Sequence, residues 1–257
     1  MGFKLGMPTL IEKNSIVDNV LLCKELGLDF IELNMNLPYC MNAKYEDILS
    51  LREKYNIDFT VHFPEEIDFG SFFDEIRYAN INLFNNIALW ASKFGAEKIN
   101  LHLNTGVYFT LPEKKVFVYD KNKEVFMGKF LDSMKIIIPV AKDLGIKICV
   151  ENMKLSNFME DTFKMMIDID DLYFTWDVGH DAMSDYKIKE VYHSAPNKVS
   201  HMHLHDFNGK SDHQILYTGI IPIEERVTFA KQNNLTTVIE VKTEKALMES
   251  VKRLKNI

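Results

Sequence analysis

The sequence predicts an α/β fold, a single (β/α)8 TIM barrel formed by residues 1–257. Short β-rich runs alternate with longer helical patterns, which is typical of βα units and a parallel sheet. The length of 257 residues exceeds that of most single domains but suits an eight-unit barrel. A connection in which a helix ends at a glycine and a strand begins one or two residues later also occurs three times along the chain.

Eight strand candidates follow one another at residues 3–7, 29–33, 58–63, 98–103, 147–151, 173–177, 199–205 and 237–241. Helical periodicity predicts helices at 14–26, 80–94, 125–144 and 244–254. Gly27, Gly95 and Gly145 directly follow three of these stretches, as expected for residues that end helices in the left-handed conformation. The joints read LGLDFIEL, FGAEKINL and LGIKICVE, and their repetition supports the barrel more strongly than any single joint.

The segment 104–123 after the fourth strand is long for a βα loop. Residues 116–119 within it predict a small strand or a hairpin. Long loops on the C-terminal face of a barrel usually serve the active site. We therefore expect either a lid or substrate wall, or a plain insertion. No linker, low-complexity segment or second domain is indicated.

Composition narrows the class of protein. The net charge is −7, so no basic balance points to nucleic acid or an anionic membrane, although bound metal ions would add positive charge that the sequence does not show. We expect neither a secretory signal nor a membrane span, because no basic start followed by an apolar stretch and no run of about 18 apolar residues is seen. Cys23, Cys40 and Cys149 form no disulfide framework, and a cytoplasmic location is the simplest interpretation. Cys149 is expected to be a buried, inert thiol.

Polar residues stand at the C-terminal ends of seven successive strand candidates. Because such positions converge on one mouth of a barrel, the pattern predicts a divalent-metal centre, since a cation holds several carboxylates together without mutual repulsion. A single histidine there would more often belong to the core, and a single carboxylate could equally be a helix cap or half of an ion pair. The residues are Glu32, His62, His102, Glu151, Asp177 with His180, His203 with His205 and Asp206, and Glu240.

The joint pattern favours Glu151, Asp177, His203 and Glu240 as the ligands. His201, His203 and His205 alternate, so they share one face of their strand. His203 is the chosen ligand because it lies near the strand end, whereas His201 lies deeper in the barrel.

At these residues the chain resembles the xylose isomerase-like TIM-barrel superfamily, which includes sugar and sugar-phosphate isomerases and epimerases as well as endonuclease IV. The resemblance covers nearly the whole chain and depends on the order of several short motifs. These are Val61-His62-Phe63-Pro64, Leu101-His102-Leu103, Val150-Glu151-Asn152, Trp176-Asp177-Val178-Gly179-His180, His203-Leu204-His205-Asp206, His213 ahead of Gly219, and Ile239-Glu240-Val241.

The epimerase members imply one divalent metal, Mn²⁺, Zn²⁺, Co²⁺ or Mg²⁺, held by the four ligands named above. The metal would polarise a sugar substrate, and Glu151 and Glu240 would move a proton through an ene-diolate from opposite faces. His180 would orient or protonate a substrate oxygen. The resemblance further implies substrate contacts from Glu32, His62, His102 and His205, and it allows a homo-oligomer.

Endonuclease IV implies a different centre of three zinc ions, in which His62, His102, His180 and His213 are also ligands, and a nucleic acid substrate. Ser211 stands where the nuclease pattern has an aspartate, and Asp212 is displaced by one position. Conversely, Asn208-Gly209-Lys210 replaces the arginine that often follows the equivalent of His203 in epimerases. A dehydratase-like enzyme and a barrel that binds a ligand without turnover are further alternatives.

Overall fold

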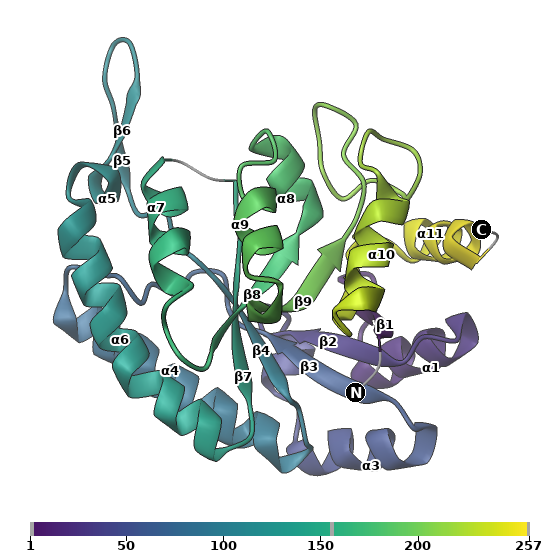
Figure 1. Ribbon diagram of the computed structural model, residues 1–257. Coiled ribbons are helices and arrows are strands. Elements are labelled where there is room, and N and C mark those ends of the chain that lie inside the picture. Colours follow the sequence, from purple (N-terminus) through teal and green to yellow (C-terminus); the bar gives the residue numbers. More distant parts are fainter. Residues whose placement is uncertain (1–2, 155–156, 256–257) are drawn as a thin grey trace.

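The computed structural model of the protein describes residues 3–154 and 157–255. In these residues, parallel strands close into an eight-stranded barrel with the neighbour order β1-β10-β9-β8-β7-β4-β3-β2. Figure 1 shows the helices wrapped around this barrel. The N-terminal strand β1 pairs with the C-terminal strand β10 and so closes it. The predicted TIM-barrel fold is therefore confirmed.

Each of the eight predicted barrel strands has a counterpart, and their ends differ by at most two residues. His205 and Glu240 lie just beyond the ends of their strands. The backbone of Glu240 still donates to Leu204 O at 3.0 Å, so its position is fixed by the sheet. The barrel strands are β1 (Lys4–Pro8), β2 (Phe30–Asn34), β3 (Asp58–His62), β4 (Lys98–His102), β7 (Lys147–Glu151), β8 (Leu172–Asp177), β9 (Val199–Leu204) and β10 (Thr236–Ile239).

Helices link the strands, and three end at the expected glycines, Gly27, Gly95 and Gly145, with φ of 64°, 76° and 72°. The helix after β3 begins at Asp74, earlier than its periodicity predicts, and its acidic first turn suits the positive end of the helix dipole. The helices are α1 (Ile16–Leu26), α2 (Pro38–Met41), α3 (Tyr45–Tyr55), α4 (Asp74–Lys93), α5 (Val118–Lys121), α6 (Lys123–Asp143), α7 (Asn157–Met166), α8 (Val178–Met183), α9 (Lys189–Ser194), the 3-10 helix η1 (Pro196–Lys198), α10 (Ile223–Gln232) and α11 (Glu244–Lys255).

The long segment after β4 forms an antiparallel hairpin of β5 (Tyr108–Thr110) and β6 (Lys115–Phe117) that projects beyond the helices (Figure 1). The strand predicted at 116–119 is wrong at its end, because residues 118–121 belong to α5. The reason is tertiary: Tyr119 is buried in that helix, packs on Phe126 and donates its hydroxyl hydrogen bond to Asp68.

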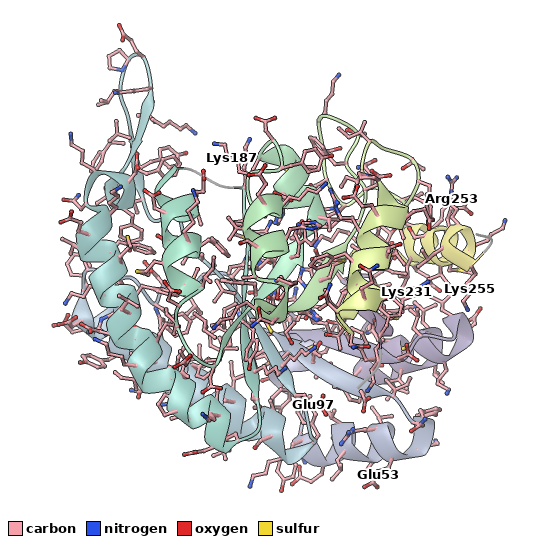
Figure 2. The ribbon with its side chains drawn as sticks, in the orientation of Figure 1. Glu53, Glu97, Lys187, Lys231, Arg253 and Lys255 are labelled. Atoms are coloured by element: carbon pink, nitrogen blue, oxygen red, sulfur yellow. The ribbon has the colours of Figure 1, made fainter. Side chains whose placement is uncertain are left out.

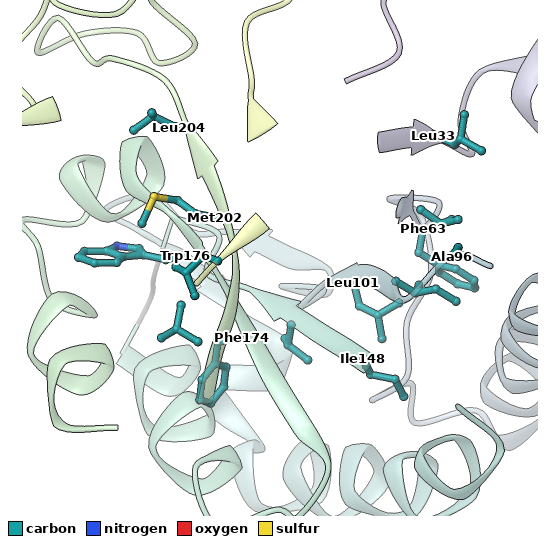
Figure 3. Packing of buried hydrophobic residues seen from close by; sticks show 14 of the residues in the cluster. Leu33, Phe63, Ala96, Leu101, Ile148, Phe174, Trp176, Met202 and Leu204 are labelled. Atoms are coloured by element: carbon teal, nitrogen blue, oxygen red, sulfur yellow. The ribbon is translucent and has the colours of Figure 1, made fainter. Parts of the chain in front are cut away.

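Side chains alternate between the two faces of each barrel strand. Phe174 and Trp176 of β8 point out of the barrel, where their rings contact Phe163 of α7 and Phe229 of α10 (Figure 3). The intervening Thr175 points inward and donates to Asn100 of β4 at 2.6 Å. The apolar core therefore lies between the strands and the helices.

The interior of the barrel is polar, whereas branched apolar residues usually fill it. Its buried side chains include Glu32, Asn100, Thr175, His201 and His203. Each of these five makes at least one side-chain hydrogen bond to another strand. Hydrogen bonding is what makes burial of so many polar groups tolerable.

Outside the barrel, Lys245 and Lys252 of α11 are exposed, whereas Lys255 donates to Leu26 O at 2.7 Å. Figure 2 shows Lys231, Arg253 and Lys255 beside α10 and α11. The thiol of Cys149 is fully buried, and burial raises its pKa to about 11. Within residues 3–154 and 157–255, we find no helix with the length and apolar character needed to cross a membrane.

Candidate metal centre

Four strand ends bring together the residues that the sequence predicts as ligands. Glu151, Asp177, His203 and Glu240 each offer a ligand atom, and these atoms all lie within 4.8 Å of one another. His203 Nδ1 is 3.2 Å from Glu151 Oε2, 3.3 Å from Glu240 Oε2 and 3.9 Å from Asp177 Oδ2. All four side chains are buried. Three carboxylates and one imidazole at this spacing form a suitable donor set for a divalent cation.

Two atoms of this cluster are buried without a hydrogen-bond partner, His203 Nδ1 and Glu240 Oε2. A buried polar atom without a partner is unfavourable, and native structures keep few of them. Both atoms face the same point between the carboxylates. A cation bound there would satisfy both, so the residues present fit a metal ion.

Two of the predicted ligands, Glu151 and Asp177, are each held from behind by a polar side chain. Asn100 donates its amide hydrogen bond to Glu151 Oε2. His205 lies 3.0 Å from Asp177 Oδ2 through Nε2, and its Nδ1 accepts from the backbone N–H of His213 at 2.8 Å. Because Nδ1 accepts, Nε2 carries the proton and donates to Asp177. Outer partners of this kind fix the orientation of metal ligands.

Glu32 supports a third predicted ligand, His203. Its Oε1 lies 2.9 Å from His203 Nε2, and it is 2% exposed. The resemblance places Glu32 and His205 in contact with substrate. In the structure Glu32 bonds to His201 and His203, and His205 bonds to Asp177. Glu32 also lines the pocket beside the centre, and the substrate contacts stay a prediction.

Two further groups flank the central four. On one side, His102 Nε2 and His62 Nε2 lie 3.3 and 3.7 Å from Glu151 Oε2. On the other side, His180 Nε2 lies 3.4 Å from Asp212 Oδ2. His180, Asp212 and His213 together place one ligand atom each within 4.8 Å, as do His62, His102 and Glu151. The structure thus gathers all the histidines predicted for a multinuclear centre.

Asp212 was not among the predicted site residues, because its position is displaced by one from the nuclease pattern. The loop compensates for this displacement: His213 adopts a left-handed backbone with φ of 54°, and Asp212 Oδ1 lies 3.1 Å from its Nδ1. Asp206 holds the loop by accepting backbone N–H groups of Phe207, Thr218, Gly219 and Ile221. The sequence spacing does not predict that Asp212 lies beside His180 and His213, because the turn conformation brings them together.

Histidines hold the carboxylates of the centre ionised. Burial alone would raise the pKa of Glu151 and of Glu240, but His203 beside them lowers both well below the ordinary value. Burial alone would lower the pKa of His180, yet Asp177 and the other carboxylates around it raise it to about 11. The carboxylates of the cluster therefore favour positive charge beside them. Protonated histidines supply this charge, and a bound divalent cation would supply it in their place.

A pocket of about 400 Å³ opens beside the centre. Its lining includes Thr9, Asn34, His62, Glu240 and Lys242. Lys242 is a further residue that the sequence did not identify: its ammonium donates to Glu240 Oε1 at 2.8 Å while Glu240 Oε2 faces the centre. The volume suits a small molecule and is small for a macromolecule.

Solved structures show which known proteins share this architecture. A D-tagatose 3-epimerase-like protein superimposes with a TM-score of 0.83 at 22% identity, covering 98% of this chain and 96% of its own. The 3-keto-D-glucoside 4-epimerase of E. coli gives 0.80 at 17% identity, covering 99% of this chain and 100% of its own. The IOLI protein with a bound zinc atom gives 0.76 at 15% identity, covering 98% and 97%. These similarities establish the fold.

Among sequence relatives, an uncharacterized protein of Methanocaldococcus jannaschii, MJ1614, is 24% identical over 245 residues, which cover 93% of this chain and 92% of the relative. The family model described as xylose isomerase-like TIM barrel matches residues 20–257. That match spans nearly the whole chain, including every ligand of the candidate centre. The chain therefore belongs to the xylose isomerase-like TIM barrel family.

Proposed function

We propose that the protein is a divalent-metal-dependent isomerase or epimerase of a small sugar or sugar phosphate. The observation that carries the proposal is the placement of two buried glutamates, Glu151 and Glu240, within 3.3 Å of His203 Nδ1, with Glu240 also lining a pocket of about 400 Å³. The names of several similar structures, which are sugar epimerases, support the same class of reaction.

Proton transfer would be the work of the two glutamates. A bound cation would polarise neighbouring carbonyl and hydroxyl oxygens of the sugar and so acidify the C–H bond between them. One glutamate would take that proton to give an ene-diolate and later release it to solvent. The other would gain a proton from solvent and return it on the opposite face. His180, whose Nδ1 is 3.5 Å from Glu151 Oε1, would donate to a substrate oxygen.

Lys242 would fix which oxygen of Glu240 remains available. Its ammonium holds Oε1, so that Oε2 stays directed toward His203 and the cation site. Asn34 on the pocket wall provides an amide group of the kind that binds sugar hydroxyls, whereas the hydroxyl of Thr9 already bonds to Glu32 O and to the backbone N–H of Asn34. Both a free sugar and a sugar phosphate are candidate substrates. The ammonium group of Lys242 on the pocket wall favours the phosphate, because it is positively charged.

The test is deuterium incorporation from heavy water into ketoses and their phosphates by the metal-loaded protein. Glu151→Gln keeps the shape of the side chain and should lower kcat/KM by at least about 10²-fold, since general acid–base groups contribute about 10²–10⁴-fold. Glu66→Gln, an exposed residue on the loop after β3, makes the same charge change and should leave turnover unaltered. Turnover by Glu151→Gln at about a tenth of wild type or better would rule out the proton-transfer role.

A second candidate function is phosphodiester cleavage at a three-metal centre, as in an abasic-site endonuclease. The observation that favours it is the pair of flanking groups, His62 with His102 and His180 with Asp212 and His213. Clustered cations would activate water and stabilise the leaving oxygen. Nucleic acid would be a partner only in this case.

Metal content per chain separates the two candidates. About one Mn, Co, Mg or Zn ion per chain, measured by elemental analysis, supports the epimerase, whereas two or three zinc ions support the phosphodiesterase. His62→Ala should leave a single-metal count unchanged and weaken substrate binding, but it should lower the count of a multinuclear centre.

A further inference from the structure

A continuous chain of polar side chains runs inside the barrel beneath the candidate centre. It starts at Lys98 of β4, whose ammonium crosses the barrel and lies 2.6 Å from Ser200 O and 2.8 Å from Thr236 Oγ1. Thr236 Oγ1 lies 2.5 Å from His201 Nδ1. His201 Nε2 then lies 2.9 Å from Glu32 Oε2. Four strands contribute to this chain.

The lower half of the chain has one consistent arrangement of protons. A lysine ammonium donates and does not accept, so Thr236 accepts from Lys98. The hydroxyl proton of Thr236 then needs an acceptor, and His201 Nδ1 is within reach. A histidine that accepts at Nδ1 carries its proton at Nε2. His201 therefore donates to Glu32 Oε2.

The upper half fixes His203. Glu32 accepts at Oε2 from His201 and faces His203 Nε2 with Oε1 at 2.9 Å. A carboxylate only accepts, so the proton of His203 that remains when a metal is bound must be on Nε2. Nδ1, which lies 3.2 Å from Glu151 Oε2 and 3.3 Å from Glu240 Oε2, is then free to bind.

We infer that Glu32, with His201 and Thr236 beneath it, acts as a positioning residue that fixes His203 as an Nδ1 ligand and sets the affinity of the centre for its metal. This inference rests on the proposed metal centre. An outer carboxylate raises the basicity of a metal-bound histidine and locks its ring. Because His203 and Glu32 are 0% and 2% exposed, water does not compete for these bonds.

The chain also connects two ends of the barrel. Lys98, Ser200 and Thr236 line a cavity of about 540 Å³ at the N-terminal mouth, on the opposite side from the candidate centre. Lys98 therefore anchors the chain where the barrel interior meets that cavity. The metal ligand at one mouth is oriented by a series of bonds that begins at the other.

The experiment measures the dissociation constants of Zn²⁺ and Mn²⁺ for metal-stripped protein by competition with a chelating dye. Glu32→Gln should weaken binding by about 10–100-fold, because an amide presents a donor to one of the two histidines. Glu66→Gln changes the charge equally without touching the chain and should bind within about twofold of wild type. Thr236→Val should weaken binding less than Glu32→Gln, and Thr236→Ser, which keeps the hydroxyl, should restore it.

A second readout needs no variant. In ¹⁵N-histidine spectra of the zinc-loaded wild type, the remaining proton of His203 should be on Nε2, with metal on Nδ1. Glu32→Gln affinity within about threefold of wild type, or metal on Nε2 of His203, would overturn the inference. A wild type that binds neither cation would instead refute the metal centre, and this inference with it. The two failures are therefore distinguishable.

Discussion

Gly179→Ala would test how the centre is buttressed. Gly179 is the second residue of α8, and an added Cβ would lie 1.9 Å from His205 Cε1 and 2.5 Å from its Nδ1. Since ordinary contacts begin near 3.5 Å, the imidazole or the helix must move by roughly 1.5 Å. His205 is fully buried and has no free space into which to rotate without losing its partners.

The magnitude follows from the bonds that would break. His205 donates to the Asp177 carboxylate at 3.0 Å and accepts from His213 N at 2.8 Å. A hydrogen bond to a charged group contributes about 1.5–3 kcal/mol and a neutral one about 1 kcal/mol. The alanine itself would return about 0.5–1 kcal/mol through lower backbone entropy. We expect a net loss of roughly 2–3 kcal/mol, or about 4–12 °C in Tm for a chain of this size.

Thermal unfolding and metal titration measure the two consequences, lower Tm and weaker metal binding through a displaced Asp177. Gly128→Ala is the matched control, because it lies in α6 with nothing within 4 Å of the added Cβ. That variant should be unchanged or slightly more stable. A Gly179→Ala protein with the Tm and metal affinity of wild type would refute the view that His205 holds Asp177.

Three further outcomes are expected. Burial lowers the pKa of Lys98 from 10.5 to about 8, so the unfolded chain binds more protons between these values and stability should rise from pH 8 toward pH 10.5. In Lys98→Met this rise should be absent, whereas Lys114→Met, an exposed control, should keep it. Equal pH profiles of unfolding free energy for the two variants would contradict the assignment. In Asp206→Asn one of the two oxygens that accept four backbone N–H bonds becomes an NH2 donor. The free energy of unfolding should fall by about 2–4 kcal/mol, and amide hydrogen exchange should be faster at residues 207–221. Removal of metal by a chelator should lower Tm reversibly, and re-addition at about 100 times Kd should restore roughly 2.7 kcal/mol; a Tm that ignores both steps would argue against a resident cation.

The fold was predictable because the alternating pattern of the strands and the helical spacing of the segments between them both indicate βα units. Alternation placed His201 and His203 on one face of β9, and the glycines marked the helix ends before β2, β4 and β7. The start of α4 was not predictable, because apolar residues around Phe72 and Phe73 hide the helical period, while Asp74 and its partners determine where the helix begins.

The candidate site was predictable where it depends on strand ends, and not where it depends on tertiary neighbours. Asn100 carries no spacing signal, since its bond to Glu151 exists only once β4 and β7 pair. Lys242 stands two residues after Glu240, but only the folded chain beyond β10 brings its ammonium onto that carboxylate. Asp212 reaches His180 because of a turn conformation, which a fixed motif spacing does not describe.

The polar interior has a consequence for how the chain folds. Asn100 with Glu151 and Glu32 with His203 each join the first half of the barrel to the second. Lys98 spans the same division to reach Thr236. A fragment containing only four barrel strands would bury one member of each pair without its partner, which is unfavourable. The two halves should therefore acquire stable structure together, and neither should persist as an autonomous half-barrel.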